Sequence, residues 1–543
     1  MIKMRNSTFK TLCSSVASSM AVSGATVLAL LFVVGSSPWA EAQSQSQSQS
    51  KAKTVKVPVK APVKIPVRAP VQTPMSNRVA QTSSLQAQNR QSIDELSFEL
   101  KFESYLNREK PPAGIPDYQQ IGAHFRTESE GRYFEGTLEL GGSFATSVEN
   151  YSNVYVPEAF LELKTENFEE AELNGDLRAR VSVGRRLETW STLDRHWDLG
   201  LWEPLNRFDT LRPIDQGLTG AFVEGGTGDF KFVAFVSGVY VPEQSASFSL
   251  QNGKLKSASP WFTEPTDRLI LFSETTQVQY DILTPSTGSV ISQTSGGVLL
   301  RYGNFTDGFY SQVSYSFKPR NQLATPFEGS LNLTDTSSFA FVQIHPKVTY
   351  HQLAGGEFGY NSVSSDGERA FGIGVSALAD LPINEFPGAN LTYQELDPMT
   401  FISPKVMVGF EALNADFELT LSYLQASGGG FTMKGPFASD KAIFGARVPF
   451  REALALDGRM VVGKGRRSTM TLGGRWLEEL SENGSMLQAD ASLDFSMNGS
   501  TQDWRVSVMG DVLGSRLPPN ENQGYVSRYR GHDRWMSQLR FVF

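Results

Sequence analysis

Five histidines, one cysteine and the arginines and tryptophans are the side chains with which this chain could do chemistry. His345 and His351 would share a face of an extended segment if Pro346 introduced no bulge. No carboxylate stands at ligand spacing beside them, which disfavours a metal site. The glycine run 428–430 lacks a following Lys-Ser/Thr and indicates a loop rather than a phosphate cradle. No local Ser/His or Asp/His motif is present either. We therefore predict no catalytic residue, no metal, no cofactor and no enzymatic activity.

The most distinctive irregular stretch spans residues 187–216. Loops longer than about 12–15 residues without secondary structure of their own are usually functional. The side chains that single out this stretch are Trp190, Trp197, Trp202, Arg207, Asp209 and Arg212. A loop so rich in aromatic rings is expected to pack against another part of the molecule.

The elements that must position these side chains are strands. Over most of the chain, apolar and polar residues alternate with a period of two, which places one kind on each face of a sheet. In residues 133–144, Phe134 and Phe144 fall on one face and Glu135 and Glu139 on the other. Such segments are longer than the five or six residues, roughly, of strands in soluble sandwiches. They match the roughly 9–11 residues of a transmembrane barrel strand, and their terminal aromatics match its girdles.

The alternation therefore predicts an all-β fold, a transmembrane antiparallel β-barrel. We expect about 18 strands, within a range of about 16–20, because bacterial barrels have even numbers. The candidate segments are 97–106, 132–144, 154–164, 176–186, 217–224, 229–241, 268–282, 296–303, 308–318, 338–350, 369–380, 388–396, 403–413, 415–425, 440–449, 453–463, 468–477, 485–496, 501–512 and 534–543. The turn at residues 498–499 should be periplasmic and the connection 513–533 extracellular. A barrel of this size leaves an aqueous channel unless a loop fills it, so 187–216 is a candidate constriction loop.

Strand parity places several arginines on the lumen side of this barrel. They are Arg178, Arg180, Arg447, Arg459 and Arg475. As pore-lining residues they would guide anionic or sugar-like solutes through the channel. The alternative is that they hold the barrel wall together by pairing with acidic residues such as Glu135, Glu139, Asp490 or Asp494.

The C-terminus carries its own pattern. Trp535, Leu539, Phe541 and the terminal Phe543 lie on one face of a last strand. An amphipathic final strand that ends in phenylalanine resembles the signal by which the barrel-assembly machinery recognises outer-membrane proteins. The resemblance implies that outer-membrane lipid and lipopolysaccharide surround the folded chain.

The N-terminus predicts export. A basic start, an uncharged apolar stretch containing Cys13, and the small-x-small sequence at residues 40–42 are typical of a secretory signal peptide. We assign residues 1–42 to this signal, 43–90 to a disordered linker and 91–543 to the barrel. The linker repeats Pro every fourth residue over 58–70 and holds eight basic residues and no acid. It is a solvated tether or the contact site of a periplasmic partner. The acidic body makes nucleic acid an unsuitable partner.

Two further segments resemble a known family. The sequence Val-Gly-Arg-Arg at 183–186 and the segment Asn-Arg-Phe-Asp-Thr-Leu-Arg at 206–212 resemble the alginate-export family of outer-membrane barrels. In that family a Gly-Arg-Gln strand end precedes a loop that closes in an Arg-Phe-Asp-x-x-Arg-like segment. Arg186 stands where the glutamine is expected, and the resemblance covers about thirty residues. It implies porin-like or exporter-like ancestry.

Together these patterns predict an outer-membrane channel for passive passage of small hydrophilic solutes or a polysaccharide. The alternative is a non-conducting barrel that anchors or docks a cell-envelope assembly. A third class, a barrel enzyme that acts on lipid, would need a titratable pair at the rim, and His196 and His532 are the residues that would test it.

Overall fold

A computed structural model of the chain describes residues 95–106, 118–130, 134–146, 151–164, 178–262, 264–265, 267–271, 274–333, 338–364, 369–384, 388, 390–436, 439–443, 447–463, 468–496, 503–516 and 524–542. The predicted signal peptide and linker, the turn at 498–499 and Phe543 lie outside these residues. None of the helices that they contain is both long and apolar enough to cross a membrane.

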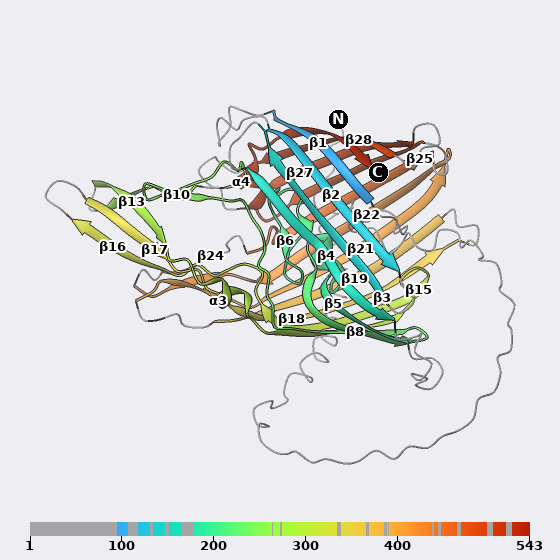
Figure 1. Cartoon of the computed structure of the whole chain (residues 1–543), viewed down its shortest axis with the longest axis horizontal. Helices are drawn as coiled ribbons and strands as arrows, with labels where there is room; N and C mark the ends of the chain where they lie inside the picture. Colours follow the sequence, from blue (N-terminus) through green and yellow to red (C-terminus); the bar gives the residue numbers. More distant parts are fainter. Residues whose placement is uncertain are drawn as a thin grey trace, which may run out of the picture. The chain divides into compact units, whose positions relative to one another are not determined.

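The main element is a closed sheet of 18 antiparallel strands (Figure 1). Its strands are β1 (Glu95–Tyr105), β2 (Tyr118–Glu130), β3 (Phe134–Ala145), β4 (Ser152–Lys164), β5 (Arg178–Arg186), β8 (Leu218–Thr227), β9 (Phe230–Ser237), β14 (Ser295–Gly303), β15 (Gly308–Pro319), β18 (Tyr350–Val363), β19 (Arg369–Ile383), β21 (Met399–Ala412), β22 (Ala415–Gly428), β25 (Glu452–Val462), β26 (Ser468–Glu479), β27 (Gly484–Ser496), β28 (Asp503–Ser515) and β29 (Arg534–Val542). Each pairs with the next in this order, and β29 pairs with β1, so the sheet closes into a barrel. The predicted fold class and strand number are confirmed.

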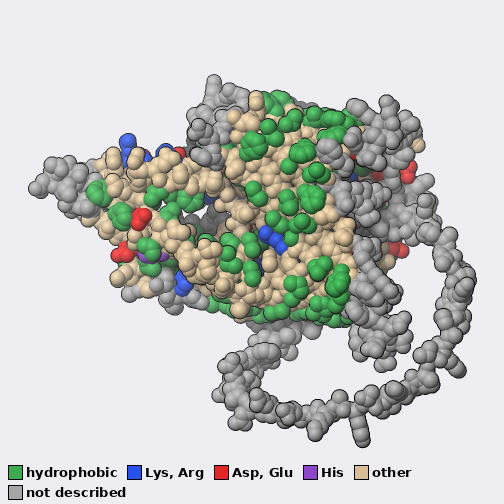
Figure 2. Space-filling model, viewed as in Figure 1, with side chains coloured by type: hydrophobic (Ala, Val, Ile, Leu, Met, Phe, Trp, Pro, Cys, Tyr) green, Lys and Arg blue, Asp and Glu red, His purple; other side chains and the backbone are tan. Residues whose placement is uncertain are grey.

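The two faces of the barrel wall are chemically opposite. On β28, Val508 and Val512 are 52% and 51% exposed on the outer face, whereas Ser507 and Asp511 are 7% and 0% exposed on the inner face. Figure 2 shows hydrophobic side chains over the outer face of the wall with few charged ones among them. A soluble protein would bury the valines and expose the aspartate. The alternation therefore turns the apolar residues outward and the polar residues toward the lumen.

Within the described residues, three smaller sheets and three short helices lie in the connections. The sheets are the hairpin β10 (Ser249–Gln251) and β11 (Lys254–Lys256); β12 (Arg268–Leu271), β13 (Glu274–Ile282), β17 (Ser338–Ile344) and β16 (Phe327–Leu333); and β20 (Tyr393–Leu396), β23 (Phe431–Lys434) and β24 (Ser439–Ile443). The helices are α2 (Thr192–His196), α3 (Thr287–Ile291) and α4 (Tyr525–Tyr529). A two-residue pair, β6 (Leu205–Asn206) with β7 (Ile214–Asp215), completes the set.

The assignment of segments to the barrel wall differs from the prediction at six places. The segments 268–282, 338–350, 388–396 and 440–449 were expected in the barrel wall, and they lie instead in or beside the smaller sheets. The wall contains β2 and β18, which the alternation did not indicate. On β18 the outer face includes Gln352, Ala354 and Gly356, and such residues give no apolar alternation. Local pattern cannot separate a strand that faces lipid from one that packs on a small sheet.

The six longest connections leave the barrel at the same end. Because successive strands are antiparallel, the connections after β5, β9, β15, β19, β22 and β28 open at one end and the turns after β8, β14 and β21 at the other. The turns are short, as at Leu413 and Asn414, both of which adopt a positive φ. This asymmetry between the two ends is typical of bacterial barrels that have long extracellular loops and short periplasmic turns.

Candidate functional site: the inner loop

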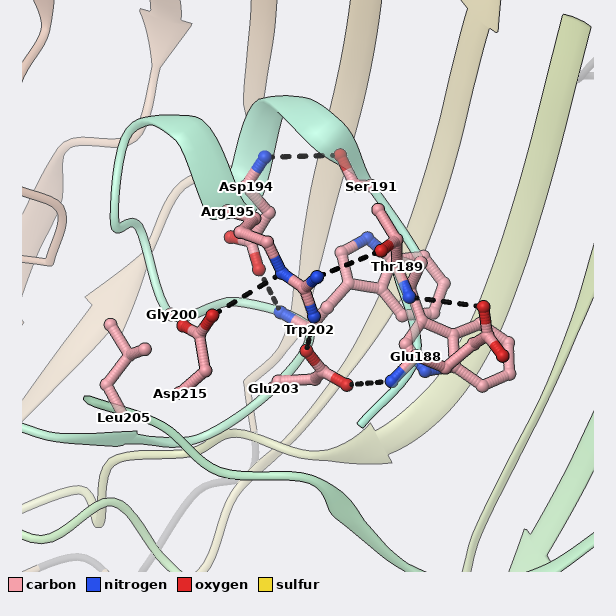
Figure 3. A pocket seen from close by; sticks show the side chains of 11 residues that line it. Glu188, Thr189, Ser191, Asp194, Arg195, Gly200, Trp202, Glu203, Leu205 and Asp215 are labelled. Atoms are coloured by element: carbon pink, nitrogen blue, oxygen red, sulfur yellow. Dashed lines mark hydrogen bonds and ion pairs between the residues drawn. The ribbon is translucent and has the colours of Figure 1, made fainter. Parts of the chain in front are cut away.

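The connection between β5 and β8, residues 187–217, is called the inner loop here. It begins with the helix α2, whose first turn is capped because Asp194 N–H donates to Ser191 Oγ at 3.2 Å. The carboxylate of Asp194 accepts from the amides of Leu201 and Trp202, at 2.9 and 3.0 Å. Figure 3 shows the second of these hydrogen bonds. Burial raises the pKa of Asp194 to about 6 although these two hydrogen bonds act in the opposite direction. One side chain thus ties the helix to the returning segment.

A second buried carboxylate holds the base of the loop. Glu203 accepts from the amide of Glu188 at 2.7 Å and pairs with Arg195 at 3.2 Å, while Arg195 also contacts Asp215 at 3.4 Å (Figure 3). Burial raises the pKa of Glu203 to about 8, and the Arg195 guanidinium only partly opposes this effect. The loop is therefore fixed by its own polar groups as well as by its rings.

The three predicted tryptophans are all buried, and two of them contact different strands of the wall. Trp190 stacks on Trp202 with ring centroids 5.3 Å apart, and it meets Phe235 of β9 edge to face at 5.1 Å. Trp197 is 0% exposed, and its Nε1 donates to Ser403 Oγ of β21 at 3.0 Å. Since β9 and β21 belong to different sides of the closed sheet, the aromatic rings bridge the space between them.

Hydrogen bonds from several strands show that the inner loop lies within the barrel. Its partners on the wall are Gln312 of β15, Glu357 of β18, Ser422 of β22, Arg475 of β26, Gln488 of β27 and Asp511 of β28. Each of these wall residues alternates with apolar residues that are exposed on the outer face, such as Val313 and Phe358. The loop therefore crosses the lumen, and its expected role as a constriction fits this position.

The remaining predicted loop residues anchor its second half. Arg207 pairs with Glu243 at 2.8 Å and donates to the carbonyl of Asp198 at 2.8 Å. Arg212 pairs with Asp511 of β28 at 2.8 Å. Asp209 accepts from Arg534 of β29 at 2.8 Å. The contacts of Arg212 and Asp209 join the loop to β28 and β29, next to the point at which the barrel closes.

The lumen arginines occupy different surroundings from one another. Arg180 faces the lumen and pairs with Glu162 at 3.3 Å. Arg475 lies 3.5 Å from Asp457 and 5.7 Å from the ring centroid of Trp197, directly against the inner loop. Arg459 lies opposite Glu418 in the register of β22 and β25. The side chain of Arg178, which begins β5, lies outside the part of the chain that the structure describes.

Arg447 was expected on a wall strand, and the structure places it elsewhere. It lies between β24 and β25, where its guanidinium pairs with Asp380 of β19 and donates to the carbonyl of Asp397 at 2.7 Å. The acidic residues named as partners pair differently as well. Glu139 binds Arg126 at 2.6 Å, and Asp494 binds Arg505 at 2.5 Å. Wall pairing is thus real, but neighbouring strands supply the partners.

Histidine, serine and aspartate meet at the inner loop without forming a catalytic relay. His196 Nε2 lies 2.7 Å from Ser422 Oγ and 3.7 Å from Asp457 Oδ2. In a serine-hydrolase triad the serine and the carboxylate bind different ring nitrogens, whereas here both approach the same one. His532 Nε2 instead meets the carbonyl of Pro260 at 2.7 Å.

The other histidine pair is separated in the structure. His351 belongs to β18 and binds Asp380 through Nδ1 at 2.9 Å, whereas His345 follows β17 of a smaller sheet. Their shared face was therefore a wrong expectation, because a change of sheet lies between them. Among the described residues no group of three or more His, Cys, Asp or Glu side chains could hold a metal ion.

Sequence reasoning missed Arg534, which is the largest fully buried charged side chain at the loop. Its place in the last strand, opposite in parity to Trp535, gives its face but not its partners. Trp535 and Leu539 do lie exposed on the outer face, at 39% and 37%. The role of these two residues and of Phe541 and Phe543 in assembly stays a prediction, and Phe543 lies outside the described residues.

Among the comparisons with known proteins, only the one with solved structures found similar proteins. No protein-family model matches the sequence, and no curated protein is similar to it. The structure is similar to Acinetobacter baumannii OccAB4 at 9% identity and a TM-score of 0.41, covering 84% of this chain and 99% of that chain. It is also similar to Pseudomonas aeruginosa OccK3 (OpdO), at 10% identity, a TM-score of 0.42 and coverage of 83% and 94%. A third similar structure is P. aeruginosa OpdK, solved with vanillate, at 10% identity and a TM-score of 0.40, covering 83% of this chain and 97% of that chain. These values establish neither a family nor a solute, and they give no support to the alginate-export resemblance.

Proposed function

We propose that the chain is an outer-membrane channel for passive passage of small hydrophilic solutes, with the inner loop as its constriction. The observation that carries the proposal is that one loop crosses the lumen of a closed barrel that is apolar outside and polar inside. Lipid accepts only spanning structures whose backbone is fully paired, and a closed barrel is one of the two that achieve this. Outer-membrane lipid and lipopolysaccharide are then the surroundings of the outer face.

The direction of insertion follows from the two ends. The long connections face the outside of the cell and the short turns face the periplasm. On this assignment the inner loop enters the lumen from the extracellular end, and the predicted linker 43–90 emerges in the periplasm. The signal peptide 1–42, delivery by the barrel-assembly machinery and a periplasmic partner of the linker belong to the same proposal. Deletion of residues 43–90 that changed no partner or phenotype would count against the partner.

Planar-bilayer recording of purified protein tests the channel. We expect steady conductance steps from the wild-type chain, and larger steps when residues 192–212 are replaced by a short Gly-Ser linker. The matched control is an equal-length Gly-Ser replacement of α3, which has no buried residue. Equal conductance for the loop variant and the wild-type chain would show that the inner loop does not limit passage.

A second function is favoured by one specific observation. Trp190, Trp197 and Trp202 are at most 1% exposed, as expected of a fixed plug. A barrel plugged in this way would be the non-conducting anchor or docking site of an envelope assembly, with the smaller sheets as contact surfaces. Silence of the wild-type chain in the bilayer, with conductance only after the loop is replaced, would favour this anchor over the channel.

The strand parity of the lumen arginines supports a further proposal, which concerns the charge of the solute. Arg459 and Arg475 face the lumen, Arg475 directly beside the inner loop, and inward charges of this kind select solutes by charge. Replacing both arginines with alanine should shift the reversal potential in a salt gradient toward cations. An unchanged reversal potential would show that they serve the wall alone. Passage of a polysaccharide, which the alginate-export resemblance implies, is tested by the same recordings in the presence of a polyuronate.

A further inference from the structure

Arg534 stands where four separate parts of the molecule meet. It begins β29, its side chain is 0% exposed, and it donates to Glu103 of β1 at 2.7 Å. It also donates to Asp511 of β28 at 2.7 Å and to Asp209 of the inner loop at 2.8 Å. Three carboxylates from three elements therefore share one guanidinium. The first two join the terminal strands, and the third brings in the loop.

A fourth part reaches Arg534 from the far side of the barrel mouth. Residues 258–262 belong to the connection between β9 and β14, and they are called the mouth segment here. Trp261 of this segment lies over Arg534, with the guanidinium carbon 4.8 Å from the ring centroid, and it is 4% exposed. It also stacks on His532 at 4.8 Å. The strands β2, β3, β4, β5 and β8 separate β9 from β1, so the mouth segment has crossed the mouth to reach the seam.

The charges around Arg534 balance only while it is present. Lys101 lies 3.4 Å from Glu103 and 3.9 Å from Asp209, and Arg212 binds Asp511 at 2.8 Å. Three cations thus face three carboxylates. A buried charge that loses its partner is strongly destabilising, because it keeps the cost of leaving water without the compensating attraction. Loss of Arg534 would leave Asp209 of the loop with Lys101, 3.9 Å away, as its cationic partner, and the ring of the mouth segment without its cation.

We propose that Arg534 is a positioning residue that latches two independent closures of the mouth to the barrel seam. It holds the inner loop through Asp209 and the mouth segment through Trp261. Changing Asp209 or Trp261 removes one arm of this latch, and changing Arg534 removes both. The assignment of these closures to a channel mouth rests on the proposed function. The contacts of Arg534 with the two segments do not depend on it.

Thiol labelling of the full chain in lipid vesicles tests the latch. The chain has one cysteine, Cys13, so a C13S background carries a single reporter. Ser259→Cys reports on the mouth segment and Thr210→Cys on the inner loop, at positions that are 6% and 9% exposed. The probe is a water-soluble maleimide, and the labelling rate follows the fraction of time that each segment is open.

Three variants should give three different patterns. D209N should speed labelling at position 210 by about tenfold and leave position 259 unchanged, since it removes one charged partner of a buried pair. W261A should speed labelling at position 259 alone. R534Q should speed both, and adding W261A to R534Q should bring no further change at position 259. The matched control is D494N, which breaks the Arg505 pair on the neighbouring strands and should leave both rates at the wild-type value.

Several results would overturn the latch. Among them are equal rates for D209N and D494N at position 210, or a change at both positions from either single-arm variant. Heat-modifiability on gels shows whether each variant has a folded barrel. If R534Q fails to fold, the two single-arm variants still decide the question. The labelling needs no ion flow, so a barrel that is silent in the bilayer would contradict the channel without touching this test.

Discussion

Asp194 and Glu203 show what a single carboxylate can do inside this barrel. Each is buried in the inner loop and accepts hydrogen bonds from main-chain amides of the same loop. The amides would otherwise face a region from which water is largely excluded, and an unpaired buried polar group costs about 1–3 kcal/mol. These residues therefore replace, for a loop with little regular structure, the ladder bonds that hold the wall.

The first prediction at this scale concerns pH. Glu203 in the packed loop keeps its proton up to about pH 8, whereas its ordinary pKa is 4.5. Packing therefore takes up a proton between these values, and the packed state loses stability as the pH rises toward 8. We expect channel openings to become more frequent by about a hundredfold between pH 6 and pH 9, because the proton is lost over about two pH units, from 6 to 8, and each unit corresponds to about tenfold.

The control for this pH effect is E203Q, which cannot ionise. Its openings should stay rare and nearly independent of pH, because the neutral form is the one that burial favours. A pH dependence of equal size in the wild-type chain and in E203Q, recorded in the same bilayers, would show that another group is responsible. Asp198, with a pKa raised by burial to about 7, would then be the next candidate.

The second prediction concerns Trp197. Its ring fills the space beside Phe450 and its Nε1 donates to Ser403, so W197A leaves a cavity and an unpaired hydroxyl. Phe or Trp to Ala changes of buried residues cost about 3–5 kcal/mol. We expect larger or noisier conductance steps with an unchanged melting of the barrel wall, followed by circular dichroism. W476A is the control, since Trp476 lies on the outer face and is 39% exposed.

The residue scale also shows what a sequence can and cannot locate. The spacing and type of Trp190, Trp197 and Trp202 indicated a loop that packs inward, and the contacts of these rings agree. Parity placed Arg180, Arg459 and Arg475 on the inner face, and in the register each lies opposite an acidic residue, Glu224, Glu418 and Asp457 respectively. The partner of each charge depends on which strand lies alongside and on where a loop returns. Neither is encoded locally, so Arg447 and Arg534 were misplaced or missed.

At the scale of elements, the alternation of apolar and polar residues in each wall strand turns the apolar side chains outward, toward lipid. The third prediction uses β28, where Val508 lies near the middle of the outer face and Val512 nearer its end. V508R should destabilise the folded barrel by about 2–4 kcal/mol and V512R by about 0–1, because the cost of arginine falls toward the interface. Urea titration in lipid vesicles measures both. Equal costs would mean that the outer face of β28 does not span a bilayer.

The same scale explains which strands a sequence predicts. Wall strands with strong apolar alternation, such as β3 and β27, were found close to their true bounds. The missed β2 and β18 have an outer face diluted by Gln, Ala and Gly, which lipid tolerates when neighbouring strands supply the apolar area. The segments wrongly assigned to the wall alternate because the smaller sheets also have one covered face. The expected total of about 18 was therefore correct, although four of the 20 candidate segments lie outside the wall and two wall strands were missed.

At the scale of the whole molecule, closure of the sheet is the property that matters. A closed barrel has no free strand edge, so it resists unfolding by detergent until heat opens the wall. The fourth prediction is that the purified chain migrates differently on gels before and after boiling. Truncation before residue 534 removes β29 and should abolish this difference, whereas removal of residues 1–90 should preserve it. A soluble, detergent-free chain with no such difference would contradict the membrane assignment.

The connection between Asp209 and Arg534 has a consequence for biogenesis. These two residues are 325 positions apart in the chain, and the ribosome synthesises the inner loop long before it synthesises Arg534. On the proposed route through the periplasm, the inner loop therefore has neither Arg534 nor a barrel wall to pack against until β29 pairs. The inner loop is fixed at the same step as the pairing of β29 with β1. A chain that reaches the membrane with β28 and β29 unpaired would therefore be leaky as well as unstable. Quality control that senses the final strand would then also protect the cell's permeability barrier.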